Sequence, residues 1–147
     1  MELIQAPIST LVESPFNYRR SFNDASLHEL ALNIQSIGIQ QPIKCRPIPD
    51  AQYSIDKQFE IVFGHRRFRA AQRVPGLEFV PIIVEPMTDE QVRIAQLSEN
   101  IQREDTSAIE EAEGLRALID ECGLKVEDIM VDTGKSRRHI YNTLRLV

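Results

Sequence analysis

The chain is poor in cysteine: its 147 residues include only Cys45 and Cys122. Two cysteines supply neither a disulfide framework nor a four-ligand zinc site, so we expect a reduced protein of the cytoplasm. No apolar run approaches the roughly 20 residues that a membrane-spanning helix needs. The N-terminal residues also lack a basic start followed by a long apolar stretch, so neither a secretory signal nor a membrane partner is expected.

The net charge of -5 hides two islands of basic residues. Residues 64–73 contain four arginines and no acid, and residues 134–147 contain Lys135 and three arginines, again without an acid. Residues 104–128, which lie between the islands, are strongly acidic. Such islands favour two anion-binding places on one chain, although two solvated helix faces would leave the same pattern.

Three segments have the pattern of β-strands: residues 43–46, 59–63 and 79–84. Pro81 in the last of them indicates an edge strand, because proline cannot donate a backbone hydrogen bond. Cys45, in the first, is expected to be a small core residue.

A first helix is predicted to begin at the capping box of Ser26 and Glu29 and to end at Gly38. Its apolar stripe needs a packing partner. The stripe comprises Leu27, Leu30, Ile34 and Ile37.

Residues 87–147 are expected to be entirely helical. Capping boxes at Thr88 and Ser107 open helices that end near Ser98 and Glu121. We therefore predict an α+β protein, with a small mixed-sheet domain at residues 1–86 and an all-helical domain at residues 87–147. Helix 88–100 is the one element that could instead pack on the sheet.

Gly64 joins the strand 59–63 to a helix over residues 65–73. The free N–H groups of a helix start bind anions, and Arg66 and Arg67 add guanidinium donors to that place. The sequence contains no G-x-x-x-x-G-K-[ST] loop, so the site is not a Walker site. A surface helix with solvated arginines, anchored in the core by Phe68 and Ala71, is the alternative.

The last basic island has the layout of a helix-turn-helix unit at about residues 125–146. A short helix over residues 126–130 is followed by a tight turn, and Ser136 caps a second helix with Ile140 and Leu144 facing inward. A plain helical hairpin is the alternative. The candidate DNA-binding residues are Lys135, Ser136, Arg137, Arg138, Tyr141 and Asn142.

Glu99, Asn100 and Arg103 gather a carboxylate, an amide and a guanidinium at the end of a predicted helix. Such groups can hold Mg²⁺ and a phosphate, although helix ends are commonly polar for no such reason.

Four motifs in this order resemble those of the ParB family of chromosome and plasmid partition proteins, whose N-terminal domain is ParB/sulfiredoxin-like. Residues 17–22 resemble its N-P-x-Q-P-R-x-x-F stretch in degraded form, residues 36–43 its G-x-x-Q-P-[IL] segment, and residues 64–70 its G-E-R-R-x-R-A motif. Residues 99–105 match E-N-[IL]-Q-R-x-[DE].

The resemblance implies a homodimeric protein that binds a centromere-like site on double-stranded DNA. It also implies CTP and Mg²⁺ as cofactors, closure of two copies into a sliding clamp, and slow CTP hydrolysis that reopens the clamp. Arg19 and Arg20 would activate a partner ATPase of the ParA type. The protein would associate with the bacterial nucleoid or a plasmid.

The resemblance also assigns residue roles within the N-terminal domain and the motif that follows it. Candidate catalytic residues are Gln41 and Glu99, and Glu99 and Asn100 would hold Mg²⁺ through the nucleotide. The nucleotide-binding residues would be Gly38, Ile39, Gln40, Gly64, His65, Arg66, Arg67, Glu99, Asn100 and Arg103.

Two departures from the family pattern stand out. His65 replaces the usual glutamate, so its side chain either points away from the nucleotide or weakens hydrolysis. The sequence ends at Val147, just after the second DNA-reading helix, so we expect either a C-terminal truncation that removes the dimerisation region or a short relative that lacks this region. The alternatives are a transcriptional repressor of this fold without nucleotide switching, and a sulfiredoxin-type enzyme, for which Phe63–Arg66 lacks the required cysteine.

Overall fold

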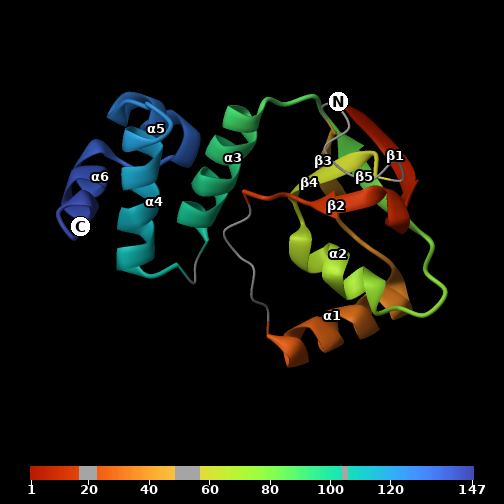
Figure 1. Cartoon of the computed structure of the whole chain (residues 1–147). Coiled ribbons are helices and arrows are strands. Elements are labelled where there is room, and N and C mark those ends of the chain that lie inside the picture. Colours follow the sequence, from red (N-terminus) through yellow and green to blue (C-terminus); the bar gives the residue numbers. More distant parts are fainter. Residues whose placement is uncertain (17–22, 49–56, 104–105) are drawn as a thin grey trace. The chain divides into compact units, whose positions relative to one another are not determined.

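The computed structural model describes residues 1–16, 23–48, 57–103 and 106–147 (Figure 1). It divides into two compact units, Met1–Met87 and Thr88–Val147. The first unit combines a sheet with helices and the second contains helices, so the predicted α+β class is confirmed. Within the described ranges, no helix is long and apolar enough to cross a membrane. The motif with Arg19 and Arg20 lies outside them.

The first unit is built on a five-stranded mixed sheet with the order β1-β5-β3-β4-β2. The pairs β1–β5 and β3–β4 are antiparallel, whereas β3–β5 and β2–β4 are parallel. A 3₁₀ turn, η1 (Ile8–Thr10), separates the first two strands. The strands are β1 (Glu2–Pro7), β2 (Leu11–Glu13), β3 (Ile43–Pro47), β4 (Phe59–Phe63) and β5 (Phe79–Val84).

The three predicted strands are confirmed, but the prediction that Pro81 marks an edge strand is wrong. β5 lies inside the sheet, between β1 and β3. Pro81 pairs with Gln5 of β1 and precedes Ile82, the first residue of β5 that pairs with β3. Proline is therefore tolerated because the second neighbouring strand has not yet joined at its position.

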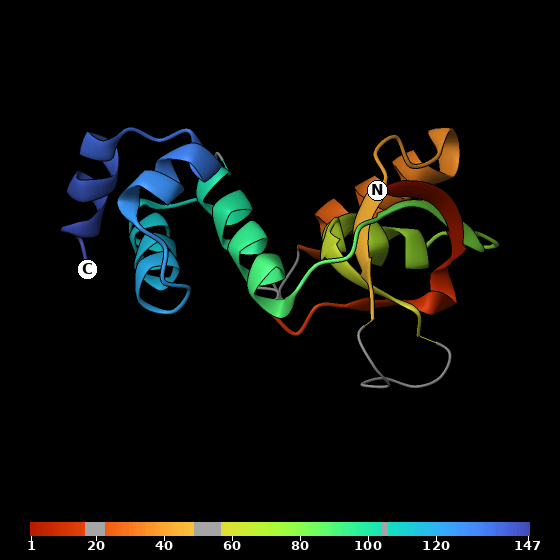
Figure 2. The same cartoon turned by 90° about the horizontal axis from the view of Figure 1, so that it is seen from above.

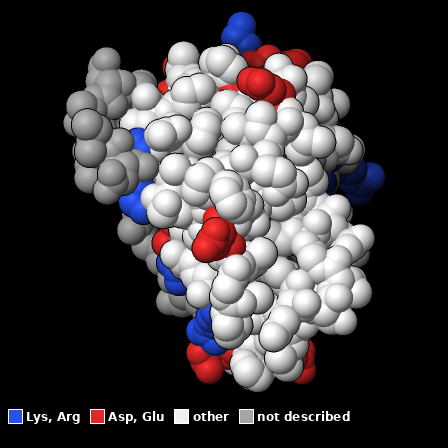
Figure 3. All heavy atoms as spheres, turned by 90° about the vertical axis from the view of Figure 1, so that its right-hand side faces the viewer, with Lys and Arg blue, Asp and Glu red and all other residues white. Residues whose placement is uncertain are grey.

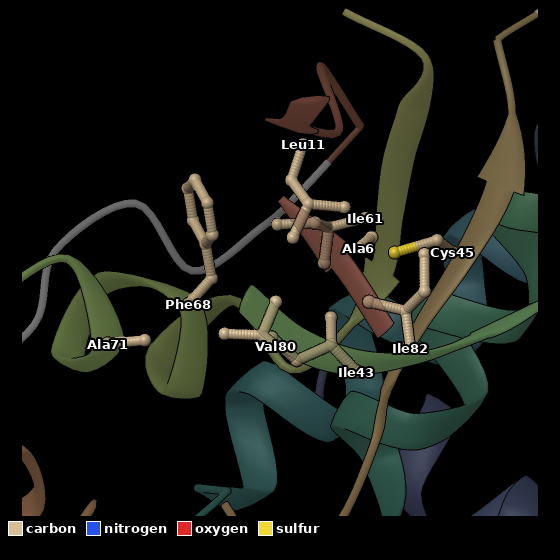
Figure 4. Packing of buried hydrophobic residues seen from close by; sticks show 9 residues of the cluster. All are labelled: Ala6, Leu11, Ile43, Cys45, Ile61, Phe68, Ala71, Val80 and Ile82. Carbon is tan, nitrogen blue, oxygen red and sulfur yellow. The ribbon is translucent and has the colours of Figure 1, made fainter. Parts of the chain in front are cut away.

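α2 (His65–Gln72) lies against one face of this sheet, and α1 (Asp24–Ile37) lies on the far side of α2 (Figure 1). Phe68 and Ala71 of α2 are buried against the strands, as predicted, and their side chains lie beside those of Val80 and its neighbours (Figure 4). α1 packs on α2 through a second apolar cluster that includes Ala70.

The predicted start and stripe of α1 need correction. The cap is Asn23, whose Oδ1 accepts from the Ser26 N–H at 2.9 Å, so Ser26 lies inside the first turn. Ile37, at the other end, is 58% exposed. α1 has 14 residues and α2 only eight, so α2 does not cover the whole of α1.

The second unit consists of α3 (Asp89–Gln102), α4 (Ala108–Asp120), α5 (Val126–Thr133) and α6 (Arg137–Leu144). The capping box at Thr88 is confirmed. α3 packs on α4 and α5, and α6 lies beside α4 (Figures 1 and 2). The core of this unit comprises Leu97, Ile101, Leu115, Ala117, Leu118, Ile129, Ile140 and Leu144.

The face on the side of β1 carries few charged side chains (Figure 3). Leu3 of β1 and Phe79 of β5 are exposed apolar residues. Lys and Arg appear only near the margins of this view, so this is not one of the basic surfaces that the sequence predicts.

Candidate functional site

A pocket of about 210 Å³ lies between the C-terminal part of α1, the turn after it, and α2. The structure brings together there Gly38, Ile39, Gln40, Gln41 and Arg67, which the resemblance assigns to nucleotide binding or hydrolysis. Sequence reasoning missed three further lining residues of α1, although their spacing of three and four places them on one helix face. These are Leu30, Asn33 and Ile34.

The lining combines apolar walls with amide groups and one guanidinium. The Nε2 of Gln40 donates to the carbonyl oxygen of Ile37 at 3.0 Å, which ties the turn to the last residue of α1. Amides offer both donors and acceptors, which suits the edge of a nucleobase. Ligand pockets generally exceed roughly 300 Å³, so this pocket suits part of a nucleotide rather than the whole molecule.

The helix start at Gly64 depends on glycine. Gly64 has φ +99° and ψ 24°, in the left-handed region, and a Cβ there would lie 3.3 Å from the Ile43 side chain. Any other residue would be both strained and crowded. Glycine has no side chain to cap α2, so the first-turn N–H groups remain candidates for binding an anion.

The arginines of α2 are bound within the first unit rather than simply solvated. Arg67 Nη1 donates to the carbonyl oxygens of Gln41 and Pro42, both at 2.8 Å. Arg66 Nη2 donates to the Ser26 hydroxyl and, at 3.4 Å, to its carbonyl oxygen. Arg67 is therefore fixed at the pocket wall, while Arg66 reaches toward α1.

The two remaining arginines form ion pairs. Arg69 binds Glu13 at the end of β2, with a distance of 2.8 Å between Nε and Oε1. Arg73 binds Asp24 in the first turn of α1 at 2.7 Å. The island that lacks acids in sequence therefore meets acids from other elements in the fold.

His65 is buried, with 7% of the residue exposed. Its Nε2 accepts from the Ser14 N–H at 3.3 Å. Burial lowers the pKa of His65 to about 4. The nearby charge of Glu13 raises this pKa, and the charge of Arg69 lowers it by a smaller amount. The imidazole is therefore neutral near pH 7 and brings no positive charge to a phosphate.

Cys45 is fully buried on β3, and burial raises the pKa of its thiol to about 12. A thiol that stays protonated is a poor nucleophile. This agrees with the expected core role and gives no support to a thiol-dependent enzyme.

The candidate metal residues belong to the second unit. α3 extends past the predicted end at Ser98, so Glu99 and Asn100 lie in its last turn. Arg103 Nη1 donates to Asn100 Oδ1 at 2.9 Å. Among the described residues, no three His, Cys, Asp or Glu side chains cluster as metal ligands.

The turn between α5 and α6 begins later than predicted, because α5 continues to Thr133 instead of ending at Met130, but the predicted glycine and serine cap are present. Gly134 closes α5 in the left-handed region, with φ +74°, and Ser136 Oγ caps α6 by accepting from the His139 N–H at 3.0 Å. Ile140 and Leu144 are buried, as predicted. Of the predicted DNA-binding residues, Lys135 is half-buried and the others are exposed.

Several side chains on this surface already have partners. Arg137 binds Glu127 of α5 at 3.0 Å. The pKa of Glu127 is lowered mainly by a backbone hydrogen bond of Glu127 itself and, next, by the hydrogen bond with Arg137. His139 lies 2.6 Å from Glu111 of α4. Sequence reasoning missed Glu111 and His139, because 28 residues separate them and no local spacing links them.

The fold and the turn together define a helix-turn-helix protein with an α+β N-terminal unit. The sequence model of the ParB N-terminal domain matches residues 1–101, and that of the ParB HTH domain matches residues 104–147. The chain belongs to the ParB family.

One curated relative is a probable chromosome-partitioning protein ParB of Coxiella burnetii. It is 40% identical over 146 residues, which cover 99% of this chain and 48% of the relative. The chain therefore spans about half the length of the curated relatives that it matches.

Two crystal structures of C-terminally truncated ParB from Caulobacter crescentus are similar. The complex with the centromeric parS site is 38% identical with a TM-score of 0.80, covering 97% of this chain and 71% of that one. The complex with CTP-gamma-S is 39% identical with a TM-score of 0.62, covering 99% and 78%.

Proposed function

We propose that this chain binds a centromere-like DNA site through α5 and α6 and binds CTP through its first unit. One observation carries the nucleotide part: the pocket joins Gly38–Gln41 to Arg67 of α2, the helix that follows Gly64. The complexes of the Caulobacter protein with parS and with CTP-gamma-S support both parts.

The pocket would hold the nucleoside, with Gln40 and Asn33 as hydrogen-bonding groups. The phosphates would be bound by Arg66 and the N–H groups at the start of α2. Glu99 and Asn100 are candidates for holding Mg²⁺ together with the phosphates, since isolated Mg²⁺ usually keeps few protein ligands.

When bound, CTP with Mg²⁺ would supply the binding energy that closes two copies into a sliding clamp, and slow hydrolysis would release them. In this proposal Gln41 and Glu99 act at the triphosphate, and Arg103 contacts the nucleotide. A ParA-type ATPase is the proposed partner, and the bacterial nucleoid or a plasmid the proposed location.

Replacing Arg67 with alanine is expected to weaken CTP binding by at least about tenfold. The variant loses a charge-assisted contact with the nucleotide and also the hydrogen bonds that hold the turn at Gln41 in place. Calorimetric titration with the four nucleoside triphosphates, with and without Mg²⁺, measures this. Wild type should prefer CTP. Arg73 is the C-cap of the same helix and is paired with the exposed Asp24, so Arg73→Ala should bind CTP like wild type.

The runner-up is a DNA-binding repressor of the same fold that uses no nucleotide. Its support is that Arg66 and Arg67 already have partners in the fold. If wild type binds the DNA site but shows no CTP affinity with that DNA present, the repressor replaces the clamp.

Replacing Arg137 with alanine is expected to weaken binding to the cognate site by roughly 1–3 kcal/mol and to relax its specificity. Both side chains of the Arg137–Glu127 ion pair are exposed, so Arg137 can readily leave this pair and contact a base instead. Lys135→Ala should instead weaken binding to every sequence alike, as loss of a phosphate contact does. Fluorescence anisotropy with cognate and scrambled duplexes separates the two, and identical behaviour would contradict this assignment of the helix face.

A further inference from the structure

The turn before α6 and the first turn of α6 share one carboxylate on α4, that of Glu111. Its Oε1 lies 2.6 Å from Nε2 of His139 and 4.0 Å from Nζ of Lys135. Only 13% of the Glu111 side chain is exposed. Such a short contact at a mostly covered carboxylate differs from the exposed ion pairs that contribute little.

Contacts inside the turn hold its backbone but do not reach α4. Thr133 Oγ1 accepts from the Lys135 N–H at 3.2 Å and donates to the carbonyl oxygen of Ile129 at 2.7 Å. Ser136 caps α6. These bonds set the path of the chain between α5 and α6, so the orientation of α6 on α4 depends on other groups.

Apolar packing between α4 and α6 and the contact at Glu111 restrain α6 in different ways. Ile140 and Leu144 of α6 share a buried cluster with Leu115 and Leu118 of α4. Burial of these residues selects the face of α6 that meets α4, although each apolar contact by itself has no preferred direction. A hydrogen bond does have a preferred direction.

We infer that Glu111 is a positioning residue for DNA reading: through His139 it fixes the rotation of α6, and it steadies Lys135 in the turn. This inference rests on the proposed DNA-binding function. An ionised carboxylate only accepts hydrogen bonds, so Nε2 of His139 is the donor. His139 thus orients the helix although 43% of its side chain is exposed. The side chains so oriented are Arg137, Arg138, Tyr141 and Asn142.

The test compares binding to a duplex that carries parS, the site in the complex of the Caulobacter relative, with binding to a scrambled duplex of equal length. Glu111→Ala and His139→Ala should each lower the ratio of the two affinities by about tenfold, as loss of a charge-assisted hydrogen bond does. The double variant should be no worse than either single variant, because both remove the same bond.

Two further variants separate positioning from folding. Glu111→Gln keeps an oxygen that can accept from His139 and should retain more of the ratio than Glu111→Ala. Glu113→Ala changes an exposed acid of the same helix and should leave the ratio unchanged. If Glu111→Ala lowers both affinities by the same factor, Glu111 is merely structural and the inference fails.

If wild type binds parS and the scrambled duplex equally well, amide hydrogen exchange measured without DNA tests the positioning of α6 by itself. Equal binding would contradict the proposed DNA site but not the contact on α4. Faster exchange of residues 137–141 in Glu111→Ala, with residues 126–133 as in wild type, would support the positioning of α6. Equal exchange of residues 137–141 in both proteins would overturn it.

Discussion

Replacing Glu60 with leucine is expected to lower the free energy of unfolding by about 3–5 kcal/mol, because it leaves a buried guanidinium without its counter-ion. Glu60 on β4 accepts from Arg46 on β3 through Nε at 2.9 Å and Nη2 at 2.8 Å. Each side chain is only 1% exposed. Arg46 Nη1 also donates to the carbonyl oxygen of Met87, the last residue of the first unit, at 3.0 Å. Urea unfolding of the variant and wild type measures the loss.

Two variants make this prediction specific to the buried pair. Arg46→Met with Glu60→Leu removes both charges, and the double variant should be more stable than Glu60→Leu alone. Lys44 lies on the same strand as Arg46, and Lys44→Met breaks its partly exposed pair with Glu85, so this variant should have a much smaller effect. A double variant as unstable as Glu60→Leu would show that packing, and not the unpaired charge, causes the loss.

The burial of Arg46 also shows where sequence reasoning reaches its limit. Strict alternation along residues 43–46 places Lys44 and Arg46 on one face and Cys45 on the other. Cys45 and Arg46 follow each other in the strand and are nevertheless both buried, and the pairing of β3 with β4 shifts register between Lys44 and Cys45. A bulge depends on the partner strand, so the pattern of one strand does not reveal it.

The elements themselves were predictable because their determinants are local. The strand at residues 59–63, the break at Gly64 and the capping box at Thr88 each depend on a few consecutive residues, and the structure contains all three. The predicted N-cap of α1 was wrong because two candidate residues lie close together. Asn23 and Ser26 are both good N-caps three residues apart, and the sequence does not show which of them the chain uses.

The pocket was predictable in part. Gly38, Gln40 and Gln41 form a continuous segment, and the resemblance to ParB proteins placed them beside a nucleotide. Arg67 is 26 residues from Gln41, and only folding of α2 against α1 brings it to that turn. The ion pair between Arg69 and Glu13, which are 56 residues apart, is likewise a product of tertiary structure.

His65 is expected to make the protein less stable as the pH falls from 7 to about 4.5. The unfolded chain binds this proton near the ordinary pKa of 6.5, whereas the buried imidazole binds it only near pKa 4. The unfolded state therefore holds more protons between these values, so the stability from His65 is present above pH 6.5 and is lost as the pH falls. From the two pKa values the loss by pH 4.5 is about 2 kcal/mol.

Replacing His65 with glutamine isolates this contribution, because glutamine can still accept from the Ser14 N–H but does not titrate in this range. The difference in unfolding free energy between pH 7 and pH 4.5, from urea titrations, should be smaller in His65→Gln than in wild type by about 2 kcal/mol. His28→Gln removes an exposed histidine of α1 and should leave the wild-type dependence intact. Carboxylates titrate in all three proteins and cancel in the comparison. An equal dependence in His65→Gln and wild type would mean that His65 takes up its proton in the folded state, and the neutral imidazole beside Ser14 would have to be abandoned.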